Sequence, residues 1–197
     1  MRQILIATHN AGKLAEFAAL LAPLGFQAVS AAQLGLPEPA ETAADFAGNA
    51  RLKAQAAARA ARIPALADDS GLCVVALDNG PGIFSARYAA GDYAAAFARI
   101  IAACAAADDW RAHFVCALCL AQPDGSTQDF TGQAHGNIAA SPMGSDGFGY
   151  DPIFIPAGYT QSYAQLGAAL KDRISHRAAA FTQMAAALSN YSTHTRS

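Results

Sequence analysis

Two adjacent aspartates, Asp68 and Asp69, are the clearest candidates for chemistry in this sequence. They stand between apolar runs at residues 65–67 and 72–77, which predict strand segments and place the acidic pair at a strand end. Two carboxylates there lose hydration and repel each other, and a hard divalent cation relieves both costs. Glu41, in the preceding loop, is a possible further oxygen ligand. We favour a metal site over the alternative, an Asx-type turn with a capping aspartate.

The N-terminal segment has groups suited to phosphate. Residues 3–7 predict a buried strand and residues 14–22 a helix, joined by a polar turn. The free N–H groups and positive dipole end of a helix start favour anions. Thr8 and Asn10 add side-chain donors there, and Lys13 adds a full charge. A capped helix with an exposed lysine explains the segment equally well when it is taken alone.

A second helix, predicted over residues 45–62, has Asp45 near its N-cap and Pro64 just beyond its end. Asn49 and Lys53 stand four residues apart and therefore share one face of this helix. Both could project towards the same polyanion, although on its own Lys53 is better explained as a solvated side chain.

A glycine-rich loop at residues 141–150 combines close backbone approach with an aromatic face. Phe148 could stack on a nucleobase, and Asp151 could accept from a ring N–H. The alternative is a flexible surface loop with a core phenylalanine.

Lys171, His176 and Arg177 gather cations near the start of a helix predicted over residues 176–188. Cations at a helix start oppose the dipole, so a function has to offset that cost.

The helices and strands expected from the sequence alternate in a way that indicates an α/β fold with a mixed sheet. A third helix is expected over residues 92–107, and residues 113–121 and 128–134 predict a hairpin. Residues 28–30 predict a short strand, residues 34–42 a loop, and residues 189–197 a polar, frayed end.

Composition narrows the possible functions. The 197 residues suffice for one substantial core, and an apolar share of 53% with 14% charged residues excludes a disordered chain. A net charge of −2 without a long basic run argues against nucleic-acid binding. The longest alanine-rich stretch is too short for a membrane span, and the N-terminal run is not a signal-peptide core, so we expect a cytoplasmic protein. The four cysteines are expected to be buried, reduced thiols rather than a metal or redox site.

Taken together, these segments resemble the inosine triphosphate pyrophosphatase family, enzymes that remove deaminated purine nucleotides. The resemblance spans almost the whole chain and is carried by six ordered motifs: Thr8-His9-Asn10-Ala11-Gly12-Lys13; Phe46, Asn49-Ala50 and Lys53-Ala54; Ala67-Asp68-Asp69-Ser70-Gly71-Leu72; Pro81-Gly82-Ile83-Phe84-Ser85-Ala86-Arg87-Tyr88; Gly147-Phe148-Gly149-Tyr150-Asp151-Pro152-Ile153-Phe154; and Lys171 with Ser175-His176-Arg177. One departure is Gly48, where many members carry an acidic residue; this chain lacks that metal-proximal carboxylate.

The resemblance implies a single domain over residues 1–197, with a long mixed β-sheet flanked by helices, two lobes with a central cleft, and a homodimer. It implies Mg²⁺ bound by Glu41 and Asp69, with Asp69 also the base that activates water. The triphosphate would be held by Thr8, His9, Asn10, Ala11, Gly12, Lys13 and Lys53, and Ser70 would contact substrate. The base would be bound by Phe148, Gly149, Tyr150, Asp151, Lys171, His176 and Arg177.

The implied reaction is magnesium-dependent hydrolysis of ITP, dITP and XTP to the monophosphate and pyrophosphate, which cleanses the nucleotide pool. Two rivals stay open. One is a pyrophosphatase of the septum-inhibitor type, acting on canonical or modified nucleotides; the loop at residues 148–151 and the Ser175-His176-Arg177 segment argue for purine reading instead. The other is a nucleotide sensor without catalysis, which gains little from two repelling aspartates.

Overall fold

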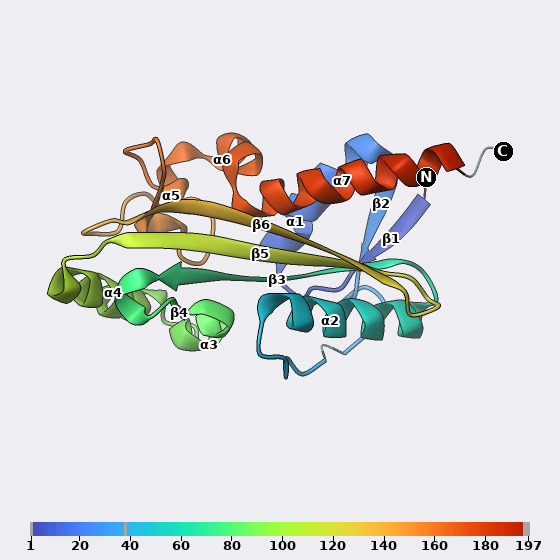
Figure 1. Cartoon of the computed structure of the whole chain (residues 1–197), viewed down its shortest axis with the longest axis horizontal. Coiled ribbons are helices and arrows are strands. Elements are labelled where there is room, and N and C mark those ends of the chain that lie inside the picture. Colours follow the sequence, from blue (N-terminus) through green and yellow to red (C-terminus); the bar gives the residue numbers. More distant parts are fainter. Residues whose placement is uncertain (1, 38, 195–197) are drawn as a thin grey trace. The chain divides into compact units, whose positions relative to one another are not determined.

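The computed structural model describes residues 2–37 and 39–194 and contains a seven-stranded sheet flanked by helices (Figure 1). The strand order is β2-β1-β3-β5-β6-β7, and β4 pairs with β3. Parallel pairs (β1 with β2 and β3) and antiparallel pairs (β3 with β4, β6 with β7) occur together, so the predicted mixed α/β fold is confirmed. In chain order the elements are β1 Arg2–Ile6, α1 Ala11–Leu21, β2 Phe26–Ser30, α2 Phe46–Ala61, β3 Ala65–Val74, β4 Gly80–Pro81, α3 Ser85–Ala89, α4 Tyr93–Ala107, β5 Arg111–Ala121, β6 Thr127–Ile138, β7 Phe154–Pro156, α5 Tyr163–Leu166, α6 Ala168–Ile174 and α7 His176–His194.

The chain divides into two compact units. Unit 1 comprises the described residues within 1–69, 117–132 and 180–197, and unit 2 comprises residues 70–116 and 133–179. The single domain and the central cleft expected from the resemblance stay predictions.

Unit 1 is built on alanine-rich packing. In α2 the residues Ala50, Ala54, Ala57 and Ala58 are buried in one cluster with alanines of β3 and β5. Such small side chains let the helix backbone approach the strands closely, and α2 runs along β3 and β5 in Figure 1. Because Asn49 and Lys53 recur with these alanines, the buried face of α2 also carries two polar side chains.

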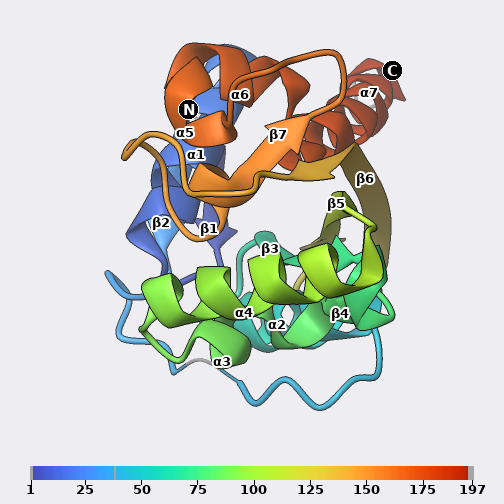
Figure 2. The same cartoon turned by 90° about the vertical axis from the view of Figure 1, so that its left-hand side faces the viewer.

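Unit 2 has a core of larger side chains. Leu72 and Val74 of β3 pack in one cluster with Ile100 of α4 and with aromatic residues, among them Phe114 and Phe154. The Phe114 and Phe154 rings meet edge to face at 4.7 Å. The short helix α3 lies beside α4, as Figure 2 shows. The second group of predicted site residues lies in this unit, on the loop before β7 and on α6 and the start of α7.

The acidic pair does not lie at a strand end, which corrects the sequence-based prediction. Strand β3 runs without interruption from Ala65 to Val74, so Asp68 and Asp69 stand inside it and not in a turn. Successive side chains of a strand point to opposite faces, so the two carboxylates do not face each other. A continuous strand and not a turn therefore positions both carboxylates, and the metal site stays a prediction.

The ends of two helices also differ from the sequence-based prediction. Helix α1 begins at Ala11 rather than residue 14, and α7 continues to His194, which contradicts a frayed end there; residues 195–197 lie outside the described part. Three short helices, α3, α5 and α6, were not predicted, because four to seven residues carry too little periodicity. Within the described residues no helix is both long and apolar enough to cross a membrane.

The predicted burial of the cysteines is confirmed. All four cysteines are free and buried. Burial raises the pKa of the Cys73 thiol to about 11, so it stays protonated and unreactive near neutral pH.

Candidate active site

The turn before α1 uses its polar side chains on the backbone. Thr8 Oγ1 accepts from the Asn10 N–H at 3.1 Å, and Asn10 Oδ1 caps the helix by accepting from the Lys13 N–H at 3.1 Å. We expected these side chains to be donors, but both act here as acceptors. Ala11 and Gly12 open the helix, and N–H groups in a first turn have no intrahelical partner. Anion binding at this point would therefore rest on backbone N–H groups and on Lys13.

Lys13 is paired with the first aspartate of β3. Its Nζ lies 2.8 Å from Asp68 Oδ2, and the Asp68 side chain is only 1% exposed. A buried carboxylate is costly unless paired, so Asp68 fixes the lysine as much as the lysine stabilises Asp68. This contact gives Asp68 a role that its sequence position alone did not reveal.

Asp69 contacts α2 and the preceding loop, where the charge of Asp68 also acts on Lys53. Asn49 Nδ2 donates to Asp69 Oδ2 at 3.2 Å, and Lys53 Nζ lies 3.5 Å from Asp69 Oδ1. The same Nζ lies 2.7 Å from Glu41 Oε1. Lys53 is only 4% exposed, so the interpretation of Lys53 as a solvated side chain is wrong. The structure brings together Glu41, Lys53 and Asp69, three residues that the resemblance placed in one site.

Burial and charge act in opposite directions in this cluster. Burial raises the pKa of Asp69, as does nearby Glu41, whereas Lys53 and the Asn49 hydrogen bond lower it; the net shift is upward. For Lys53, burial opposes the charged form, but the surrounding carboxylates outweigh it and raise its pKa. Lys53 therefore stays charged, and Asp69 gains proton affinity, as a general base requires.

The donor set fits a hard cation. Glu41 and Asp69 converge on one ammonium, so their oxygens already share a positive charge. Two carboxylates, with substrate phosphates and water as the remaining ligands, match the way Mg²⁺ binds in proteins. Within residues 2–37 and 39–194 no group of three or more His, Cys, Asp or Glu side chains could hold a metal by itself.

Gly48, the departure from the family pattern, is tightly packed. A Cβ built there would lie 2.5 Å from the Ala43 Cβ and 3.1 Å from Asp45 Oδ1. An acidic side chain at this position requires the loop before α2 to move. Gly48 therefore allows the loop that carries Glu41 to lie close to the helix.

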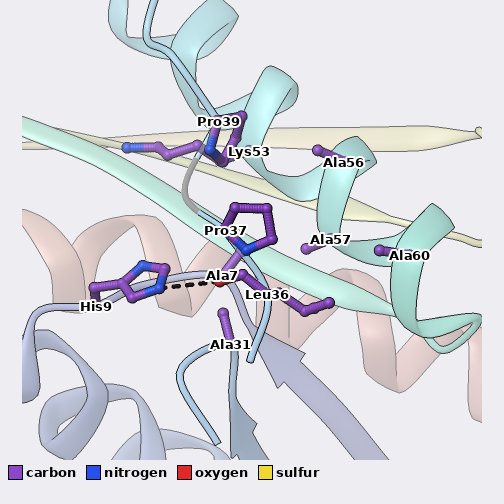
Figure 3. A pocket seen from close by; sticks show the side chains of 10 residues that line it. All are labelled: Ala7, His9, Ala31, Leu36, Pro37, Pro39, Lys53, Ala56, Ala57 and Ala60. Atoms are coloured by element: carbon purple, nitrogen blue, oxygen red, sulfur yellow. Dashed lines mark hydrogen bonds between the residues drawn. The ribbon is translucent and has the colours of Figure 1, made fainter. Parts of the chain in front are cut away.

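A small pocket of about 120 Å³ lies beside this cluster in unit 1. It is lined by Ala7, His9, Ala31, Leu36, Pro37, Pro39, Lys53, Ala56, Ala57 and Ala60 (Figure 3). His9 Nε2 is hydrogen-bonded to the Leu36 carbonyl at 3.1 Å, the dashed line in Figure 3. The alanines, prolines and leucine of this lining suit alkyl groups and not phosphates, so within the pocket the triphosphate prediction depends on Lys53 and His9.

The second group of predicted residues lies in unit 2. Lys171 Nζ is 2.6 Å from Asp151 Oδ2, and both side chains are buried. The same carboxylate oxygen accepts from the Phe148 N–H at 2.9 Å. Lys171 also lies over the Phe148 ring, 4.3 Å from its centroid. Gly147, with φ +79°, has no room for a Cβ because Asp151 Oδ2 occupies that space. The Asp151 carboxylate thus fixes the glycine-rich loop.

Arg177 and His176 approach this group from the start of α7. The Arg177 guanidinium carbon lies 5.9 Å from the Phe148 ring centroid, and the side chain is 2% exposed. His176 stacks on Phe114 at 4.7 Å with an interplanar angle of 11°. Lys171, however, lies in the last turn of α6, where a cation is favoured by the dipole, so the unfavourable placement expected for all three cations does not apply to it.

Ser70, Gly149 and Tyr150 are the remaining predicted site residues. Ser70 follows Asp69 in β3 and is half-buried. Gly149 has φ +63°, and the Tyr150 hydroxyl donates to the Ser85 carbonyl at 2.7 Å. Tyr150 is thus held by unit 2 itself, which weakens the case for its side chain as a ligand.

Residues 4–187 match the model of the Ham1 family. The chain belongs to the Ham1 family. Two related proteins named dITP/XTP pyrophosphatase are similar over most of their length. That of Rhodospirillum centenum is 54% identical over 188 residues, 93% of each chain, and that of Gluconobacter oxydans is 50% identical over 182 residues, 91% of this chain and 88% of the other. A solved Ham1 structure from Coxiella burnetii has a TM-score of 0.87 at 37% identity and covers 96% of this chain and 100% of its own.

These relatives confirm the family expected from the sequence motifs. They also confirm the class of protein, an enzyme of the nucleoside-triphosphate pyrophosphatase type.

Proposed function

We propose that this Ham1 family member hydrolyses dITP, XTP and ITP to the nucleoside monophosphate and pyrophosphate, and that it needs Mg²⁺. The observation that carries the proposal is the buried cluster in which Glu41 Oε1 and Asp69 Oδ1 lie 2.7 Å and 3.5 Å from Lys53 Nζ. Burying these charged side chains costs desolvation free energy. A function offsets that cost if the lysine binds the triphosphate and the carboxylates bind its metal ion. The names of the relatives support dITP and XTP as substrates.

The roles proposed for unit 1 follow from charge. Lys13, Lys53 and the N–H groups that open α1 would bind the triphosphate oxygens. Glu41 and Asp69 would hold Mg²⁺, which when bound supplies neutralisation of the phosphate charge.

The proposed chemical step begins with Asp69. Its carboxylate accepts a proton from a water molecule, whose oxygen forms a bond to the phosphorus nearest the sugar. The bond from that phosphorus to the bridging oxygen breaks, and pyrophosphate leaves with the bond electrons.

The roles proposed for unit 2 concern the base. Phe148 would offer a stacking face, and the cations Lys171 and Arg177 near its ring would donate towards a 6-oxo acceptor. Adenine carries a 6-amino donor, so donor would face donor and ATP would be rejected. GTP shares the 6-oxo group and is harder to reject.

The test is kcat/KM for pyrophosphate release from ITP, XTP, ATP and GTP, with and without Mg²⁺. We expect magnesium-dependent turnover and clear preference for ITP and XTP over ATP. Comparable values for ATP and ITP would contradict the purine-sanitising assignment, and turnover without a metal would contradict the magnesium site. Wild-type rates in Asp69→Asn would contradict its role as the base.

We also propose that the protein is a cytoplasmic homodimer, as the family resemblance implies. Light scattering coupled to size-exclusion chromatography tests the dimer, and cell fractionation tests the location. A monomer at micromolar concentration would contradict the first of these.

A further inference from the structure

Among the described residues of unit 1, Asn49 is the polar side chain that is most completely buried. It lies on the buried face of α2, one turn before Lys53, and is 0% exposed. Its Oδ1 accepts from the Ala43 N–H at 3.0 Å, and its Nδ2 donates to Asp69 Oδ2 at 3.2 Å. A single side chain therefore joins the loop that follows Glu41 to the strand that carries Asp69.

The chemistry of the two partners fixes how this amide points. A backbone N–H can only donate, so the Ala43 N–H requires an acceptor and turns Oδ1 of Asn49 towards the loop. The NH₂ group then faces Asp69, whose ionised carboxylate can only accept. Leucine offers neither group, and aspartate offers two acceptors. An amide of this length is therefore the side chain that serves both ends.

Asn49 also completes a closed circuit of contacts. From Asn49 the circuit passes to Asp69, through Lys53 to Glu41, and back along the loop to Ala43. Each oxygen of Asp69 thus has its own donor, Asn49 at 3.2 Å and Lys53 at 3.5 Å. The lysine contact is longer and comes from a flexible stem. The amide is the shorter contact and is held on a helix, so it sets the direction of the carboxylate.

We propose that Asn49 is a positioning residue that orients the Asp69 carboxylate and seats the loop carrying Glu41. The inference rests on the proposed role of Asp69. Groups that orient a base or a metal ligand act on the rate and on metal affinity more than on binding of the remote parts of the substrate. Loss of Asn49 should therefore lower kcat and weaken Mg²⁺ binding while KM for the triphosphate changes little.

The experiment compares Asn49→Ala with Asp45→Ala. Asp45 caps the same helix by accepting from the Gly48 N–H at 2.6 Å, but it has no part in the proposed site, so it is a matched control for local destabilisation. For Asn49→Ala we expect kcat to fall about 10–100-fold and the calorimetric Kd for Mg²⁺, measured with a non-hydrolysable triphosphate analogue bound, to rise by a similar order. For Asp45→Ala both should stay within about twofold at a comparable loss of thermal stability. Equal effects in the two variants would overturn the inference.

A second variant covers the case in which the alanine variant does not fold. Asn49→Asp keeps the shape and the acceptor for the Ala43 N–H but turns an oxygen towards Asp69. It should lose kcat although the loop stays anchored, and wild-type kcat in this variant would also overturn the inference.

Asp69→Asn separates this inference from the proposed function. If Asp69→Asn is inactive while Asn49→Ala behaves as wild type, the inference alone fails. If Asp69→Asn keeps the wild-type rate, the proposed role of Asp69 fails first. When both hold, the double variant should be no slower than Asp69→Asn, because residues that act as a unit are not additive.

Discussion

Replacing Lys171 with methionine tests whether the buried ion pair of unit 2 holds the glycine-rich loop. Lys171 and Asp151 are 5% and 3% exposed, and their charged atoms lie 2.6 Å apart. Methionine keeps most of the volume of the side chain but removes its charge. The Asp151 carboxylate would then remain buried without its Lys171 contact.

The magnitude follows from what remains around Asp151. Removing one partner of a buried pair costs about 3–5 kcal/mol, since the other charge stays uncompensated. The Phe148 N–H still donates to the carboxylate at 2.9 Å, which places the expected loss near the lower figure. Lys171 also lies 4.3 Å from the Phe148 ring centroid, and loss of that contact adds about 1 kcal/mol. We expect a total loss of about 4 kcal/mol in the free energy of unfolding.

The assay is urea unfolding followed by fluorescence. Trp110 is the one tryptophan in the sequence and packs against the core of unit 2, so its emission reports the unit in which the change is made. The matched variant is Lys171→Met combined with Asp151→Asn, which removes both charges and keeps an oxygen for the Phe148 N–H. This double variant should recover most of the loss. A single variant within about 1 kcal/mol of wild type, or a double variant as unstable as the single, would refute the reasoning.

Three further changes probe other contacts. Lys13→Met should reduce kcat/KM by an amount equivalent to about 1–3 kcal/mol, because it removes a phosphate contact and leaves Asp68 without its 2.8 Å partner; unchanged steady-state kinetics would contradict the phosphate site. Gly48→Ala should lower the melting temperature although alanine favours helices, because its Cβ would lie 2.5 Å from that of Ala43, an overpacking cost of about 1–3 kcal/mol; a raised melting temperature would show that the loop yields freely. Burial, and then the neighbouring histidine of β6, lower the pKa of His113 below 6.5. The folded chain therefore binds fewer protons than the unfolded chain just below pH 6.5, and stability present above that value is lost as pH falls through the lowered pKa. His113→Gln should flatten this decline in thermal unfolding between about pH 7.5 and about pH 5, and an unchanged slope would contradict it.

Local signals in the sequence determined the order of most elements, and the family resemblance supplied the candidate site residues. Asp45 capping α2, Asp92 capping α4 and the proline just after α2 mark helix ends through contacts within a few residues. The ordered motifs determined the family, because many short matches at the right spacing are far more specific than any one of them. Glu41, Lys53 and Asp69 were placed together by that resemblance before their contacts were known.

Only the tertiary structure determined the ion-pair partners of the two aspartates. From the sequence, Asp68 and Asp69 look like one acidic pair. In the continuous strand β3, Asp68 pairs with Lys13 at 2.8 Å and Asp69 lies 3.5 Å from Lys53, while both carboxylates raise the pKa of Lys53. The sequence could not show this, because it turned on whether residues 68–71 continue a strand or form a turn. That choice depends on sheet hydrogen bonds to partners far away in the chain.

The role of Asn49 was hidden for the same reason. Helical spacing put it on the face of Lys53, yet its partners lie six residues back in a loop and twenty residues ahead in a strand. An isolated asparagine is expected at a surface, and only the packing of α2 alanines against the strands encloses it. Burial then turns an ordinary amide into a fixed link, because each of its hydrogen bonds must be made where water cannot replace it.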